Sequence, residues 1–176
     1  FPGQVQLRVQ TRNCVPSPNI LANVSYSSRL ITSYLQPCDP HDLVAVFCSG
    51  GPTLMDNLGA ILELAKDPSN YILCVKHAHD RLIQAGVVPW GCVLLDPRPH
   101  VQDFIENPHP KVNYIVATMC HPTTIDRLVD AKARVLGYNA LVGAGEETVL
   151  PPKSYLINGG TTSAVRGISV LHFLGF

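Results

Sequence analysis

The sequence predicts an α/β fold with a mostly parallel sheet and helices on both faces. Short continuous apolar runs, rich in valine, recur along the chain, as in strands that are buried on both faces. Segments with helical spacing of apolar residues separate these runs, and glycines and prolines mark the junctions. This alternation is typical of βαβ units, whose right-handed crossovers place helices over the sheet. We therefore expect a Rossmann-like three-layer sandwich.

Composition narrows the class of protein. The 176 residues are 46% hydrophobic, which is enough for one domain with a substantial core. The formal net charge is zero and lysine and arginine form no runs, which argues against nucleic-acid or anionic-membrane binding. No apolar run approaches the roughly 20 residues of a membrane-spanning helix. We expect no nucleic-acid partner and no membrane span.

The cysteines indicate a reducing compartment. None is spaced as CxxC, and three of the six fall inside expected buried strands. They are Cys14, Cys38, Cys48, Cys74, Cys92 and Cys120. A free cysteine behaves as a small buried hydrophobe. We predict reduced thiols rather than disulfides or a metal site, and hence a cytoplasmic location.

Two regions are expected along the chain. Residues 1–41 would form an N-terminal arm and a helix that pack on the core, because Gln4–Gln10 alternates glutamine with apolar residues and Ile20–Leu35 has helical apolar spacing. Residues 42–176 would form a Rossmann-like nucleotide-phosphate-binding domain. Its last helix ends with Gly175 in the usual C-terminal position, where an α/β chain normally enters another strand. We therefore expect this domain to be truncated at its C-terminus.

The first expected strand, Leu43–Cys48, ends at a glycine turn that opens a helix. Pro52 suits the first helical position, where its missing N–H costs nothing. Apolar residues then recur at helical spacing as far as Ala65. The next strand, Tyr71–Val75, precedes a helix over His77–Gln84.

The second half repeats the alternation. Gly91–Leu95 is a strand that precedes a short helix near Val101–Ile105. Tyr114–Ala117 is another buried run, and the apolar face of Pro122–Asp130 predicts a helix. The remaining expected elements are strands at Ala133–Tyr138 and Ser154–Ile157, an optional strand at Ala140–Val142, a loop at Gly143–Pro152, and a closing helix that begins after Asn158.

Polar and small residues follow the strands, where an open parallel sheet binds its ligands. Glycine-rich turns let a ligand approach the backbone, and the free N–H groups of a helix's first turn suit a phosphate. The predicted ligand-binding residues are Ser49, Gly50, Gly51, Pro52, Thr53, Lys76, His77, Arg98, Asn158, Gly159, Gly160, Thr161 and Thr162. We expect two helix openings, near residues 51 and 160, to lie side by side and face a common anion.

Known motifs exclude several alternatives. The first turn lacks the Gly-Lys-Ser/Thr of a P-loop and the GxGxxG dinucleotide fingerprint. No His/Cys cluster has zinc-ligand spacing, and Ser49 lacks the GxSxG elbow of hydrolases.

Asp96 and His121 are the predicted catalytic residues. Asp96 follows a strand, where a carboxylate can hold a ribose hydroxyl or a divalent cation or act as a base, although a residue before proline can also simply form a turn. His121 is the strongest candidate for a general acid or base, and its alternative role is a helix cap.

A set of short motifs, in order, resembles one known family. The motifs are Gly50-Gly51-Pro52-Thr53-Leu54, Gly86-Val87-Val88-Pro89, Leu94-Leu95-Asp96-Pro97, His121-Pro122, Gly159-Gly160-Thr161-Thr162-Ser163 and Leu174-Gly175-Phe176. They resemble the family of archaeal 6-hydroxymethyl-dihydropterin pyrophosphokinases and of the central domain of motility accessory factors, which glycosylate flagellin. That central domain is similar in fold to bacterial sialyltransferases, which bind a CMP-sugar. The chain departs from the family at Thr53, at Lys76-His77-Ala78 and at Pro89-Trp90.

The resemblance implies a transferase whose donor is a nucleotide or nucleotide-sugar. It would place the donor phosphates or base on Gly50, Gly51, Pro52 and Thr53, with Gly160, Thr161 and Thr162 on the other side. We expect glycosyl transfer from a CMP- or similar nucleotide-sugar. One alternative is pyrophosphoryl transfer from ATP to a hydroxymethylpterin-like acceptor, in which Asp96 would bind Mg²⁺. The other is a non-catalytic Rossmann-like docking module.

Overall fold

The computed structural model describes residues 15–151, 154–160 and 162–176. The expected N-terminal arm at Gln4–Gln10 lies outside these residues. Six parallel strands form one sheet in the strict order β1-β2-β3-β4-β5-β6. The strands are β1 (Val44–Cys48), β2 (Asn70–Val75), β3 (Gly91–Leu94), β4 (Asn113–Ala117), β5 (Arg134–Ala140) and β6 (Leu156–Ile157). The predicted α/β class is confirmed, and the described strands pair only in parallel.

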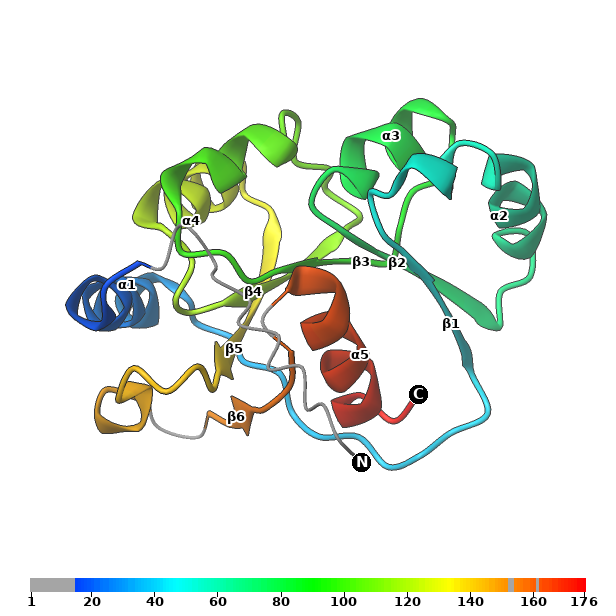
Figure 1. Ribbon diagram of the computed structural model, residues 1–176. Helices are drawn as coiled ribbons and strands as arrows, with labels where there is room; N and C mark the ends of the chain where they lie inside the picture. Colours follow the sequence, from blue (N-terminus) through cyan, green and yellow to red (C-terminus); the bar gives the residue numbers. More distant parts are fainter. Residues whose placement is uncertain (1–14, 152–153, 161) are drawn as a thin grey trace, which may run out of the picture.

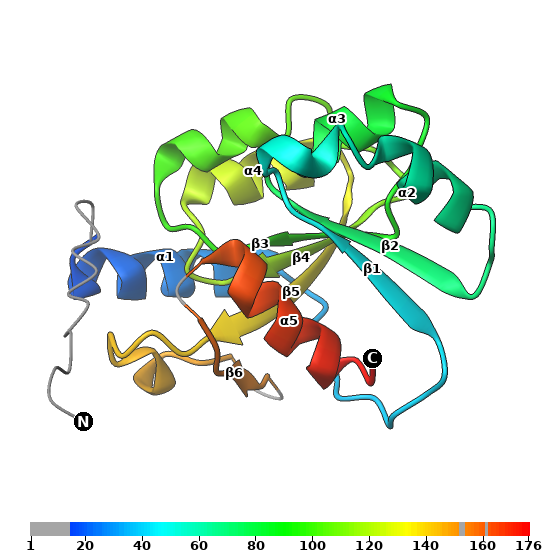
Figure 2. The same ribbon diagram turned by 45° about the vertical axis from the view of Figure 1, so that its right-hand side comes forward.

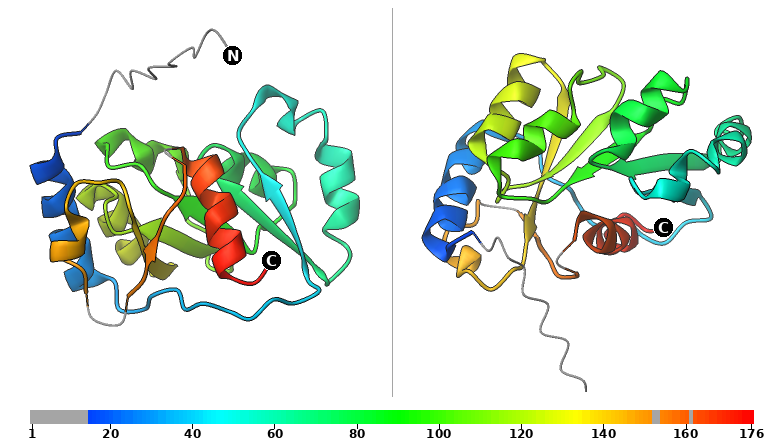
Figure 3. Two further views of the ribbon diagram at one scale, coloured as in Figure 1. Left: turned by 60° about the horizontal axis from the view of Figure 1, so that its bottom comes forward. Right: turned by 45° about the horizontal axis from the view of Figure 1, so that its top comes forward.

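Helices cover both faces of the sheet (Figure 1). One face carries α2 (Leu58–Leu64), α3 (Ala78–Gln84), the 3₁₀ helix η2 (Pro99–Phe104) and α4 (Pro122–Asp130). The helix α5 (Ser163–Phe173) crosses to the opposite face, as the rotated view shows (Figure 2). A helix α1 (Ser17–Leu30) lies beside α4 and beside the segment between β5 and β6 (Figure 3). The arrangement follows from uniform right-handed crossovers, which put successive helices on one side of a sheet whose strands add in sequence order.

Close packing fixes α5 on the sheet. Gly167 lies on the helix face that meets β1, and a methyl group at this position would lie 2.1 Å from Cζ of Phe47. The ring of Phe47 therefore rests on the helix backbone, where only glycine leaves room. Val170 and Leu171 of α5 are buried in the same core.

Several expected boundaries are wrong. The helix expected at Ile20–Leu35 begins at Ser17 and ends at Leu30. After the helix, Tyr34 forms an isolated parallel bridge with Gly137 of β5. The continuous helix expected from Pro52 is instead a 3₁₀ turn, η1 (Pro52–Leu54), followed by α2. At the junction, Asn57 is the N-cap of α2, and its backbone N–H and side-chain amide both donate to the carbonyl of Thr53, at 3.2 and 2.9 Å.

The boundaries expected for the later elements agree more closely with the structure. The helix Pro122–Asp130 is confirmed to the residue. The short helix expected near Val101–Ile105 is a 3₁₀ turn that begins at Pro99. The strand expected at Ser154–Ile157 has only the two residues Leu156–Ile157. The strand expected at Ala133–Tyr138 runs on to Ala140, and the loop at Gly143–Pro152 includes the 3₁₀ turn η3 (Glu146–Thr148).

The buried thiols form a row across the sheet. Cys48, Cys74 and Cys92 are register partners on β1, β2 and β3, and all three are free and buried. Cys120 is also free and buried, whereas Cys38 is free and exposed. These side chains pack as small apolar groups in the core.

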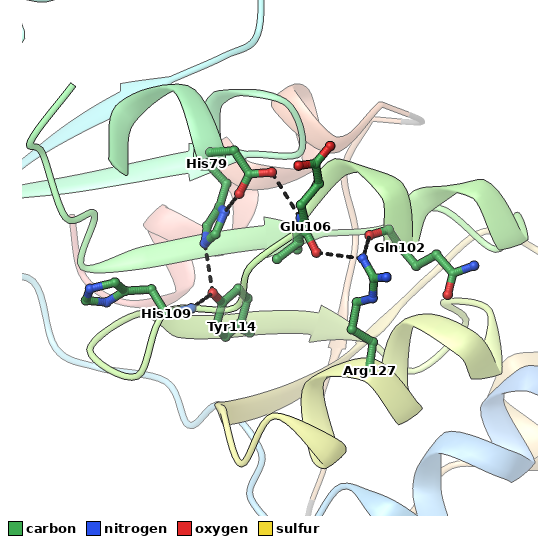
Figure 4. Close-up of polar contacts among 8 residues, drawn as sticks. His79, Gln102, Glu106, His109, Tyr114 and Arg127 are labelled. Carbon is green, nitrogen blue, oxygen red and sulfur yellow. Dashed lines mark hydrogen bonds and ion pairs between the residues drawn. The ribbon is translucent and has the colours of Figure 1, made fainter. Parts of the chain in front are cut away.

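A buried polar network joins α3, β4 and the segment after η2 (Figure 4). The ring of His79 is fully buried, with Nδ1 2.6 Å from Oδ1 of Asp80 and Nε2 2.8 Å from the hydroxyl of Tyr114. That hydroxyl also accepts the backbone N–H of His109 at 2.6 Å. Arg127 of α4 donates to the carbonyls of Gln102 and Ile105, at 2.9 and 3.0 Å. These contacts join α3, η2, β4 and α4.

None of the helices in the described part of the chain has the length and hydropathy needed to cross a lipid bilayer.

Candidate functional site

A cavity of about 810 Å³ opens at the carboxyl ends of the strands. Its volume falls in the range of small-molecule and cofactor sites. All six strands contribute residues that follow them, and the start of α1 adds one wall. The lining comprises Val15, Ser17, Ile20, Ser49, Gly50, Gly51, Val75, Lys76, His77, Leu95, Asp96, Pro97, Arg98, Met119, Val142, Gly143, Ala144, Thr162, Ser163 and Ala164. The turn at 49–51 and the start of α5 at 162–164 therefore line the same cavity.

One carboxylate and two cations form the charged part of the lining. Oδ2 of Asp96 lies 2.7 Å from Nζ of Lys76 and 2.5 Å from an amino nitrogen of Arg98, while Oδ1 accepts Nε of Arg98 at 2.7 Å. The Asp96 side chain is 8% exposed. Burial alone would raise the pKa of Asp96, but the hydrogen bonds and charges of Arg98 and Lys76 outweigh it and hold that pKa far below its usual range. The cluster keeps a net charge of +1 at neutral pH.

The ion pairs of Asp96 argue against its predicted roles as a base and as a Mg²⁺ ligand. Both carboxylate oxygens are occupied by cationic donors, and a carboxylate with so low a pKa is a weak base. Asp96 is also the only carboxylate among the described lining residues. A Mg²⁺ site normally takes one or two carboxylate ligands with free oxygens, so this donor set does not fit a resident divalent cation. Asp96 instead orients Lys76 and Arg98.

Lys76 owes its position to an unusual backbone. Its φ is +43°, in the left-handed region that non-glycine residues rarely adopt. The turn carries the chain from the end of β2 directly into α3, and it brings the Lys76 ammonium to Asp96 after β3. Strain of this kind is found where function requires a particular side-chain placement.

His77 also lines the cavity and is exposed to solvent. Its ring packs on that of Phe104, with 3.8 Å between the ring centroids. Gly50 lies against it, since a methyl group at position 50 would be 3.0 Å from Cβ of His77. Among the described histidines, His77 alone lines the cavity.

The wall formed after β5 and β6 depends on two buried charges. Glu146 accepts the backbone N–H groups of Val142, Gly143 and Ala144, the last two at 3.0 and 2.6 Å. Burial opposes ionisation of this carboxyl, but these backbone hydrogen bonds lower its pKa. Arg166 is 1% exposed and donates to the carbonyls of Ile157, Gly160 and Leu141, the last two at 3.1 and 3.0 Å. Both side chains therefore shape segments that line the cavity.

Several predicted site residues do not line it. Pro52, Thr53, His121, Asn158, Gly159 and Gly160 are absent from the lining, and Thr161 lies outside the described residues. His121 caps α4, with Nδ1 accepting the backbone N–H of Thr123 at 3.3 Å. Gly159 and Gly160 allow the turn to approach α5, because methyl groups there would lie 2.3 Å from Ser169 and from Val165, respectively. His121 thus has a capping role, and Gly159 and Gly160 have a packing role.

Other parts of the lining carry no local signal in the sequence. Val15, Ser17 and Ile20 reach the cavity because α1 packs beside α4, and such a contact is not encoded by a nearby motif. Val142, Gly143 and Ala144 belong to a segment that the sequence marks only as a loop. Ser163 belongs to the glycine-rich motif before α5, and this motif is a signal from which its place in the lining could have been inferred.

Comparison with known proteins identifies the family of the chain. A family model described as 6-hydroxymethylpterin diphosphokinase MptE-like matches residues 18–176. No curated protein matches the chain. The fold is similar to that of the MAf glycosyltransferase from Magnetospirillum magneticum AMB-1, with a TM-score of 0.74 and 18% sequence identity. The match covers 93% of this chain and 26% of the other, so this chain spans about a quarter of that protein's length.

Proposed function

Since the chain belongs to the 6-hydroxymethylpterin diphosphokinase MptE-like family, as its motifs predicted, we propose that it is a transferase that binds a nucleotide-activated donor in the cavity. The observation that carries the proposal is the cluster of Lys76, Asp96 and Arg98 at the carboxyl ends of β2 and β3. Two fixed cations at this edge of a parallel sheet suit the phosphate of a nucleotide. The donor we favour is a CMP- or similar nucleotide-sugar.

The chemistry would be glycosyl transfer. The oxygen of an acceptor hydroxyl attacks the anomeric carbon of the sugar, and the bond from that carbon to the nucleotide phosphate oxygen breaks. The imidazole of His77 takes the proton of the hydroxyl, a role for which histidine is the commonest choice. The nucleotide leaves as an anion, whose growing charge Lys76 and Arg98 stabilise. His77 replaces His121 and Asp96 as the proposed base, because His121 caps α4 and Asp96 is held in ion pairs.

A second candidate is diphosphate transfer from ATP, and the family description favours it. Such a reaction depends on metal and cationic charge around the transferred group. The single, fully paired carboxylate of the described lining supports glycosyl transfer instead. The two candidates also differ in donor, so a binding experiment separates them.

The test is a thermal-shift and calorimetric titration with CMP, and with ATP in the presence of Mg²⁺. A ligand at a hundredfold excess over its Kd stabilises the folded state by about 2.7 kcal/mol. We expect CMP to raise the melting temperature and Lys76→Met to abolish most of the shift. Lys66→Met is the matched control, because Lys66 is exposed and, among the described residues, forms an ion pair with Glu63 alone.

The outcomes separate three functions. A shift with ATP and Mg²⁺ but none with CMP would support the diphosphokinase. A shift with neither nucleotide would favour the non-catalytic docking module. If CMP binds, His77→Gln should retain binding and lose turnover with a nucleotide-sugar, whereas unchanged turnover would rule out His77 as the base.

A further inference from the structure

The side chains that line the cavity are segregated by charge. Lys76, Asp96 and Arg98, the charged residues of the described lining, follow β2 and β3. Another part of the lining comes from α1 and from the segments after β4 and β5, and we call it the α1 side. Its lining side chains are those of Val15, Ser17, Ile20, Met119, Val142 and Ala144. All except Ser17 are apolar, so the described α1 side offers a ligand one side-chain hydroxyl and no charge.

Backbone polar groups of the α1 side are paired within the protein. The N–H groups of residues 142–144 donate to the buried carboxylate of Glu146. The carbonyl of Met119 accepts the side-chain amide of Asn23, from α1, at 3.1 Å. Because these groups already have partners, a ligand on this side meets mainly the apolar side chains.

Those side chains retain surface that a ligand can cover. Val142 is 38% exposed, and Val15 is half-buried. Removing apolar surface from water is favourable, and a methionine such as Met119 adapts to the shape of its neighbour. The cavity volume of about 810 Å³ also lies toward the upper end of the range of about 300–1,000 Å³ that is typical of ligand sites. A second molecule therefore has room beside a nucleotide.

We propose that the α1 side binds the acceptor of the transfer reaction, and that this acceptor is an alcohol whose hydroxyl is carried by an apolar body. The inference rests on the proposed function for the role of acceptor, whereas the apolar character of the ligand rests on the lining alone. A sugar or a peptide acceptor would place polar groups against side chains that cannot hydrogen-bond them, and burying such groups unpaired costs free energy. The charged cluster is left to the donor phosphate.

The experiment is calorimetric titration of the full chain with naphthol, an apolar alcohol, and with glucose, a polar one, each with and without saturating CMP. We expect naphthol to bind in both conditions and glucose to bind in neither. Titrations at several temperatures should give naphthol binding a negative heat-capacity change, which marks the burial of apolar surface.

Three variants locate the bound alcohol. Val142→Asn should weaken naphthol binding by about fivefold or more, because an amide replaces apolar contact surface, and should leave CMP binding unchanged. Ser17→Val should tighten naphthol binding, a gain that a poorly folded variant cannot produce. Val88→Asn is the matched control and should change neither affinity. Val88 is 42% exposed, lies in the loop between α3 and β3, and is not among the described lining residues.

The failures of the two proposals are distinguishable. If CMP binds and naphthol does not, the apolar acceptor is wrong and the nucleotide site stands. Naphthol binding that CMP displaces, or that Val142→Asn leaves intact, would also overturn the acceptor site, since the alcohol would lie elsewhere. Weaker binding to Ser17→Val would overturn it too, because the hydroxyl would then be a polar anchor. Naphthol binding that depends on Val142, without any CMP binding, would keep the apolar site and reject the nucleotide donor. Binding of none of the probes would overturn both.

Discussion

Lys76 and Asp96 meet across the ends of neighbouring strands, with 2.7 Å between Nζ and Oδ2. Twenty residues separate them in the chain, and the parallel pairing of β2 with β3 brings them together. Arg98 holds the same carboxylate from the other side. The charged part of the cavity is therefore a consequence of strand order.

Substituting Asp96→Asn should lower the free energy of unfolding by about 1–3 kcal/mol, between the values for exposed and for buried ion pairs. The loss arises because two partly buried cations would share no counter-charge. Urea denaturation, followed by the fluorescence of Trp90, measures it. Asp67→Asn is the control, since the exposed Asp67 carboxylate accepts hydrogen bonds from Ser69 and pairs with no cation among the described residues. A loss no larger than that of the control would contradict the structural role of Asp96.

Gly167→Ala should be destabilising by about 1–3 kcal/mol, the usual cost of overpacking. The new methyl group would overlap the ring of Phe47. Gly59→Ala in α2 is the matched control, because nothing lies within 4 Å of the added carbon. That substitution should stabilise by about 0.5–1 kcal/mol. Phe47→Leu should relieve part of the Gly167→Ala penalty in a double-mutant cycle, and strict additivity would refute the contact.

His79 should make stability depend on pH. Burial lowers the pKa of His79 below its ordinary value of 6.5, against the opposing effect of Asp80. The unfolded chain then binds more protons than the folded one, so stability is present above about pH 6.5 and is lost as the pH falls toward the folded pKa. The limit is about 1.4 kcal/mol per pH unit for one proton.

The measurement is urea denaturation at a series of pH values between 7 and 5. His79→Gln should flatten the slope, whatever its effect on stability at pH 7. His172→Gln, at an exposed position on α5, should leave the slope unchanged. An unaltered slope in His79→Gln would show that other groups carry the pH dependence.

Arg166→Met should cost about 3 kcal/mol or more, because one buried and two partly buried carbonyls would lose a charged donor. Arg166→Lys should recover only part of the loss, since an ammonium cannot match the fork of a guanidinium. Arg134→Met, at an exposed position that begins β5, is the control. If the three variants were equally stable, the guanidinium would not hold β5, β6 and α5 together.

The strands were predictable because their apolar runs are continuous, and the helix Pro122–Asp130 because His121 and Pro122 mark its start. The break between η1 and α2 was not predictable, since the apolar residues keep helical spacing across it. Within the cavity, the sequence predicted the residues that directly follow strands, such as Lys76 and Arg98. It did not predict the wall from α1, because nothing local in the chain encodes how a helix packs on a distant neighbour.

The position of α5 has a consequence for synthesis. A ribosome releases the six strands in the order in which they pair, so the sheet can grow by addition at one edge as the chain emerges. The ring of Phe47, on the first strand, is not covered by α5 until Gly167 has been synthesised, more than a hundred residues later. The cavity gains the wall formed by Thr162, Ser163 and Ala164 only when that helix docks, so a shorter nascent chain has an incomplete cavity.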